Sequence, residues 1–127
     1  MNIKKLIAGS MFSMLLVSEM AAADWGDVYY CQMTNFSLIT VEGEKENYKL
    51  AKFQFKLDKT KNAMVFGSTG YLSDQVIELV GTWNLPSQER WDANDAYSVI
   101  NFNDGSFLFA SVSFLGISSI LADCEKF

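Results

Sequence analysis

Hydrophobic and polar residues alternate along several short segments of the chain, most clearly over 51–57. Ala51, Phe53, Phe55 and Leu57 are apolar, and the residues between them are lysine or glutamine. Strict alternation places the two sets of side chains on opposite faces of a β-strand. The segment therefore predicts a strand with one buried face and one solvated face.

Other segments are rich in β-branched and aromatic residues, which also favours strands. We expect these strands at 27–33, 36–41, 63–66, 96–103, 106–114 and 117–124. Asn103-Asp104-Gly105 tolerates positive φ and predicts a hairpin turn. Glu42 to Asn47 is polar and predicts another turn. A change in the phase of alternation at Leu50-Ala51 predicts a β-bulge.

The segment 71–83 is harder to assign. Ser73 could cap a short helix over 74–80. However, residues 76–80 are rich in β-branched side chains, which favours a strand. Residues 84–94 are mostly polar and predict the longest loop of the chain.

Seven or eight short strands without a convincing long helix predict an all-β fold, either a small antiparallel barrel or a sandwich. Cys31 and Cys124 lie near the two ends of the predicted domain. We expect them to form a disulfide, with two buried thiols as the alternative. A disulfide would make the terminal strands neighbours, which favours a barrel.

The first 23 residues predict a cleavable signal peptide. Lys4 and Lys5 precede an apolar stretch of 12 residues, Leu6 to Val17, and Ala21 to Ala23 supplies small residues for cleavage. An uncleaved membrane anchor is the alternative, but a membrane span needs about 20 residues. We therefore expect a single domain over 24–127 that is periplasmic or secreted and not inserted in a membrane.

Charge and composition narrow the classes of function. Cleavage would remove Lys4, Lys5 and Glu19, leaving eight basic and 14 acidic residues and a net charge of −6. Such a chain repels phosphate backbones and anionic lipids, so nucleic acid and anionic membranes are not expected partners. The chain has no histidine, the residue used most often as a metal ligand and as a general base. We expect a monomeric, non-enzymatic protein without a metal or cofactor.

The predicted loop between Trp83 and Trp91 is the candidate binding site for a small molecule or a glycan. Aromatic rings stack on the apolar faces of sugars, and nearby carboxylates and amides accept hydrogen bonds from sugar hydroxyls. Alternatively, both rings fill the end of the barrel. The candidate ligand-binding residues are Trp83, Trp91, Asp92, Asn94, Asp95 and Tyr97.

Other features support weaker hypotheses. Asp92, Asn94 and Asp95 have calcium-binding oxygens but lack the spacing of a calcium loop. Five lysines could bind an acidic partner, although lysine commonly protects the exposed edges of sheets; they are Lys49, Lys52, Lys56, Lys59 and Lys61. The alternative function is a protein-interaction or inhibitor module that acts on an envelope enzyme.

Overall fold

The computed structural model describes residues 23–80 and 90–127, which form β-strands joined by turns and loops. The predicted signal peptide, apart from Ala23, lies outside the described residues, as does Trp83. The nine described strands are β2 (Val28–Thr40), β3 (Lys45–Asn47), β4 (Lys52–Asp58), β5 (Ala63–Phe66), β6 (Val76–Glu78), β7 (Arg90–Asn94), β8 (Ser98–Asn103), β9 (Ser106–Ser113) and β10 (Gly116–Lys126).

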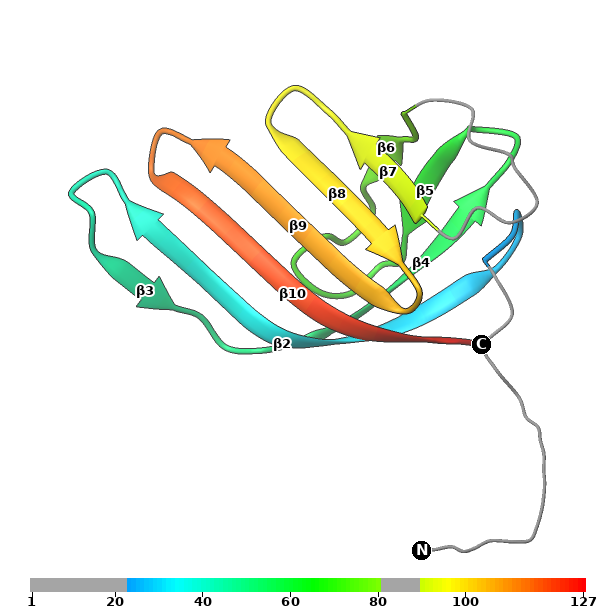
Figure 1. Ribbon diagram of the computed structural model, residues 1–127, viewed down its shortest axis with the longest axis horizontal. Coiled ribbons are helices and arrows are strands. Elements are labelled where there is room, and N and C mark those ends of the chain that lie inside the picture. Colours follow the sequence, from blue (N-terminus) through cyan, green and yellow to red (C-terminus); the bar gives the residue numbers. More distant parts are fainter. Residues whose placement is uncertain (1–22, 81–89) are drawn as a thin grey trace, which may run out of the picture.

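Eight of these strands form a nearly closed antiparallel barrel in the order β6-β5-β4-β2-β10-β9-β8-β7 (Figure 1). The two ends of this path meet through a bridge between Leu79 and Ala93 and a hydrogen bond from the Val80 N–H to the Asp92 carbonyl (2.8 Å). Among the described strands, β3 pairs only with β2, at Ser37, Leu38 and Ile39. The predicted all-β class is confirmed, and of the two predicted architectures the barrel is the one observed.

The predicted disulfide between Cys31 and Cys124 is also confirmed. The two residues are directly paired in the antiparallel ladder between β2 and β10. The first and last described strands are therefore neighbours, and the bond closes a loop with a sequence separation of 93 residues. Such a bond is consistent with an oxidising compartment.

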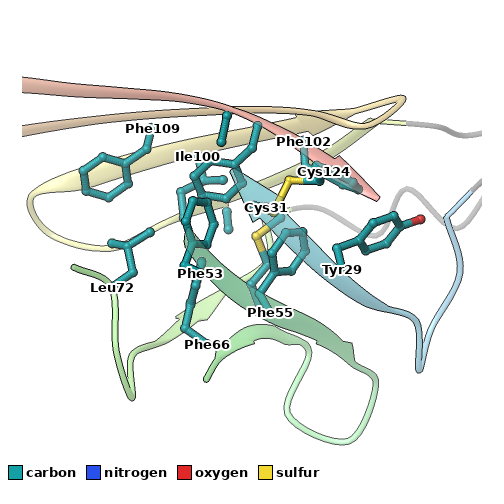
Figure 2. Close-up of a cluster of buried hydrophobic side chains, with 14 of the residues drawn as sticks. Tyr29, Cys31, Phe53, Phe55, Phe66, Leu72, Ile100, Phe102, Phe109 and Cys124 are labelled. Atoms are coloured by element: carbon teal, nitrogen blue, oxygen red, sulfur yellow. A yellow bond between two sulfur atoms is a disulfide. The ribbon is translucent and has the colours of Figure 1, made fainter. Parts of the chain in front are cut away.

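Aromatic side chains pack the interior of the barrel (Figure 2). Phe107 of β9 has its ring centroid 4.9 Å from that of Phe53, 5.7 Å from that of Phe55 and 6.1 Å from that of Phe66. Phe55 and Phe107 are almost completely buried. Because the interior holds protein side chains, binding surfaces are to be sought on the outside of the barrel.

β2 differs most from the prediction, because one continuous strand of 13 residues replaces the two expected at 27–33 and 36–41. Its pairing with β10 shifts register between Leu121 and Ala122, so Thr34 is the extra residue of a β-bulge. A bulge exchanges the two faces of a strand. Met33 and Phe36 thus both lie on the inner side, and the broken alternation obscured the continuity.

Three further predictions of local structure were wrong. Residues 90–94 form β7 and do not belong to a loop. The predicted turn at 42–47 contains β3. Leu50-Ala51 holds no bulge, because the chain leaves β3 there and begins β4 at Lys52. The preference for a strand over a helix in 76–80 is confirmed by β6.

The C-terminal parts of β2 and β9 and the N-terminal part of β10 reach beyond the aromatic core. Together with β3, they project to the left in Figure 1. We call this part, residues 37–47 and 110–119, the extension. Its strands pair with one another. No other strand among the described residues packs on its outer face.

Candidate functional site

A groove of about 530 Å³ crosses the outer face of β7, β8, β9 and β10. Its volume lies within the range of about 300–1,000 Å³ that is typical of ligand sites. The side chains that line it from the outer face include Arg90, Asp92, Asn94, Val99, Asn101, Leu108, Ala110, Ser119 and Leu121.

The floor of the groove is apolar because alternation turns these side chains away from the core. Leu108 and Leu121 are direct partners across β9 and β10. They are 45% and 42% exposed, and Val99 on β8 is 57% exposed. Their neighbour Phe109 points inward and is buried. The floor therefore offers apolar contact area that the fold itself leaves open.

Hydrogen-bonding groups of β7 and β8 form one end of the groove. The Asp92 carboxylate accepts hydrogen bonds from Arg90 Nε (3.1 and 3.2 Å) and from Asn101 Nδ2 (2.7 Å). A carboxylate has about four acceptor positions, so these bonds leave acceptor capacity on Asp92. The Asn101 amide oxygen is a second acceptor beside it. This end is suited to a ligand with N–H or O–H donors.

The other end of the groove is neutral. Ser119 Oγ lies 3.2 Å from Ser37 Oγ and accepts a hydrogen bond from Asn35 Nδ2 (3.3 Å). Asn35 Nδ2 also lies 3.4 Å from Ser37 Oγ. The three side chains are therefore hydrogen-bonded to one another, and a ligand covering them would leave none of these bonds broken.

Two of the predicted site residues, Asp92 and Asn94, line this groove. Trp91 lies between them in β7 but faces the opposite way and is only 9% exposed. Its ring packs edge-on against Trp25, with 5.0 Å between the ring centroids, and its Nε1 has no hydrogen-bond acceptor among the described residues. Trp91 thus occupies the barrel interior, which was the alternative placement considered for it.

Asp95 and Tyr97 lie in the turn between β7 and β8, outside the groove. Asp95 Oδ1 accepts hydrogen bonds from the backbone N–H groups of Tyr97 (2.9 Å) and Ser98 (2.8 Å). This carboxylate shapes the turn. Tyr97 is 72% exposed. The structure therefore divides the described members of the predicted site between groove, core and turn.

The weaker hypotheses gain no geometric support. Over residues 23–80 and 90–127, no three His, Cys, Asp or Glu side chains gather as a metal site would require. Lys52 and Lys56 lie on the solvated face of β4, as the alternation predicted. In the same ranges, no helix is long and apolar enough to cross a membrane.

A second hollow, of about 370 Å³, lies on the outer face of β10, β2 and β4. It is lined in part by Lys52, Asp123 and Glu125, which are solvated charged side chains. The groove over β7 to β10 is larger and more apolar, so we take it as the candidate site.

Sequence reasoning missed Val99, Asn101, Leu108 and Leu121 as site residues. A signal was present, because residues 107–110 in β9 are all apolar. A strand with only one buried face should alternate. Apolar side chains on both faces indicate that the outer face is also a contact surface.

The comparisons with known proteins identify no relative: no protein-family model, no curated protein and no solved structure matches this chain.

Proposed function

We propose that this protein is a non-enzymatic binding module that holds a small, largely apolar molecule in the groove over β7 to β10. The observation that carries the proposal is the combination of an apolar floor, Leu108 and Leu121, with the acceptor pair Asp92 and Asn101 at one end. Apolar sites with a few polar groups that orient the ligand are typical of small-molecule binding.

The lining favours a small molecule over a glycan. Sugar recognition relies on an exposed aromatic face, and the outward-facing side chains of the groove include none. The ligand that best matches the site is an apolar body carrying one or two donor groups, such as an amine or a hydroxyl. Its donors would meet Asp92 and Asn101 while its apolar part covers Leu108.

The disulfide supports placing this function in an oxidising compartment. Together with the N-terminal pattern of Lys4 to Ala23, it favours a periplasmic or secreted protein that meets its ligand outside the cytoplasm.

The test is a two-dimensional NMR titration of the ¹⁵N-labelled protein with a library of small apolar amines and alcohols. We expect at least one compound to shift the amide signals of Asn101, Leu108 and Leu121 in a saturable manner. Leu108→Trp should fill the groove and weaken binding at least roughly tenfold. Val76→Trp, a matched change at an exposed residue of β6, should leave the affinity unchanged.

The proposal fails if no compound shifts the groove signals, or if Leu108→Trp binds as well as the unchanged protein. Saturable shifts that cluster instead around Trp91 and Tyr97 would place the binding site at the loop predicted from sequence.

A further inference from the structure

Large apolar side chains are exposed together on the outer face and tip of the extension. They are between 41% and 87% exposed, and they are Ile39, Val41, Val112, Phe114, Leu115 and Ile117. At these exposed fractions the six side chains present on the order of several hundred Å², the scale of the largest apolar patch of a typical monomer, about 300–600 Å². We call these six residues the apolar tip. It involves none of the side chains that form the floor of the groove.

The fold does not require apolar residues at the turn between β9 and β10. Phe114 and Leu115 form this turn and are 87% and 57% exposed, in a position where polar residues are usual. Gly116, in contrast, is required. Its φ is +141°, and a Cβ there would collide with the carbonyl oxygen of Ile39. The backbone of the tip therefore depends on Gly116, while Phe114 and Leu115 are free to serve a contact.

Three of the tip residues form a continuous row across the sheet. Ile117 is paired with Val112 on β9 and with Ile39 on β2, so the three side chains stand side by side on the outer face. All three are β-branched and none is ionisable. Two such rows can interdigitate when sheets pack face to face, as in β-sandwiches.

Next to this row lie the charged Lys45 of β3, which is paired with Ile39, and three polar side chains that are already hydrogen-bonded. Asn35, Ser37 and Ser119 bond to one another on the outer face, and Ser37 is only 6% exposed. Covering these three side chains would therefore leave none of their bonds broken, and none of them would be buried without a partner.

We propose that the apolar tip and the adjoining outer face pack against the same surface of a second copy of this chain. Area and charge favour this occupant. The tip supplies an area of the same order as the roughly 800 Å² that each partner contributes to a standard interface. The three residues of the row are uncharged, and Lys45, which is paired with Ile39 at the margin, is exposed, so two copies can meet over the row with their charges at the rim. Glu42 and Glu44 in the adjacent turn disfavour an anionic lipid surface as the occupant.

This inference does not depend on the groove having a ligand. It is tested by sedimentation-velocity and light-scattering measurements on the purified protein from 1 to 100 µM. We expect twice the monomer mass at the upper concentrations. Val112→Lys should raise the dimer dissociation constant at least roughly 100-fold, since it places a charge in the apolar row that the two copies would bury. Val76→Lys is the matched control, because Val76 is 50% exposed and Val112 is 60% exposed.

Thermal melts of both variants would verify that they remain folded. A protein that stays monomeric at 100 µM overturns the proposal, and so does a dimer that tolerates Val112→Lys. Flotation with vesicles of zwitterionic phosphatidylcholine tests the remaining possibility, that a lipid surface covers the apolar tip. A monomer that floats with these vesicles, and loses this with Val112→Lys, would identify lipid as the occupant and would also overturn the proposal.

Discussion

The extension continues three strands of the barrel, β2, β9 and β10, yet the inner face of β9 changes in character between the two regions. In β9, Phe107 and Phe109 point into the barrel and are buried. Two residues further along the same face stands Ser111, while Val112 faces outward and is 60% exposed. Within β9, therefore, the inner face changes from apolar to polar, while the outer face is apolar at Leu108 as well as at Val112.

This change on the inner face separates residues that maintain the fold from residues that are available for contacts. Burial of apolar area is the main source of folding free energy, and the buried rings belong to the barrel. The extension is held mainly by the ladders that join β10 to β2 and β9. Mutations in the barrel should lower stability, and mutations at the apolar tip should alter association and leave stability nearly unchanged.

The largest expected effect is the loss of the disulfide in the barrel. A bond that closes a loop of this length stabilises a protein by about 4–5 kcal/mol in the chain-entropy model. The double variant Cys31→Ser/Cys124→Ser should therefore melt roughly 20 °C lower than the oxidised protein. Calorimetry with and without a reductant measures this. An unchanged melting temperature would show that the link between β2 and β10 does not stabilise the barrel.

The second effect compares two phenylalanines of one hairpin. Phe107→Ala should lower the free energy of unfolding by about 4 kcal/mol, because it leaves a cavity among the rings of Phe53, Phe55 and Phe66. Phe114→Ala should change it by less than about 0.5 kcal/mol. Urea unfolding at low protein concentration measures both. Equal losses would contradict the division between barrel and extension.

A smaller effect concerns Tyr29, whose side chain is buried in the barrel. Burial, followed by the nearby negative charge of Asp27, raises the pKa of Tyr29 to about 12 from its ordinary value of 10.0. Between pH 10 and 12 the unfolded chain loses this proton while the folded protein keeps it. The contribution of Tyr29 to the free energy of unfolding should therefore be fully present below pH 10. It should decrease by on the order of 2 kcal/mol as the pH rises to 12.

Tyr29→Phe is the control for this pH dependence. It removes the titrating group, so its unfolding free energy should lose this part of the alkaline decrease. Short denaturant-unfolding measurements at several pH values test the difference. Identical pH profiles for the two proteins would mean that Tyr29 does not titrate between pH 10 and 12.

The parts of the fold that the sequence predicted best rest on local signals. The alternation over 51–57 gave β4, with Phe53, Phe55 and Leu57 buried. The turn before β9 was also predicted well, since Asp104 and Gly105 adopt positive φ. Alternation and turn chemistry depend on neighbouring residues, so they can be followed without knowing the partners of a strand.

The errors arose where pairing with distant segments decides the structure. The bulge at Thr34 is defined by the register of β2 against β10, and the local pattern suggested a break instead. β7 was taken for a loop because Arg90 to Asn94 is polar, yet it becomes a strand by pairing with β8. In both cases hydrogen bonds to a remote strand outweighed the local preference.

The sequence by itself determined that this protein is an all-β domain with one disulfide, because alternation, turn residues and paired cysteines are local or compositional properties. It also named Asp92 and Asn94 as candidate ligand-binding residues, together with Trp91, Asp95 and Tyr97, which do not line the groove. Only the tertiary structure decided which face each side chain occupies. The pairing of Trp91 with Phe102 turns Trp91 into the core, and the pairing of Leu108 with Leu121 builds the floor of the groove. A groove made by four strands is a property of their registers, which no single segment contains.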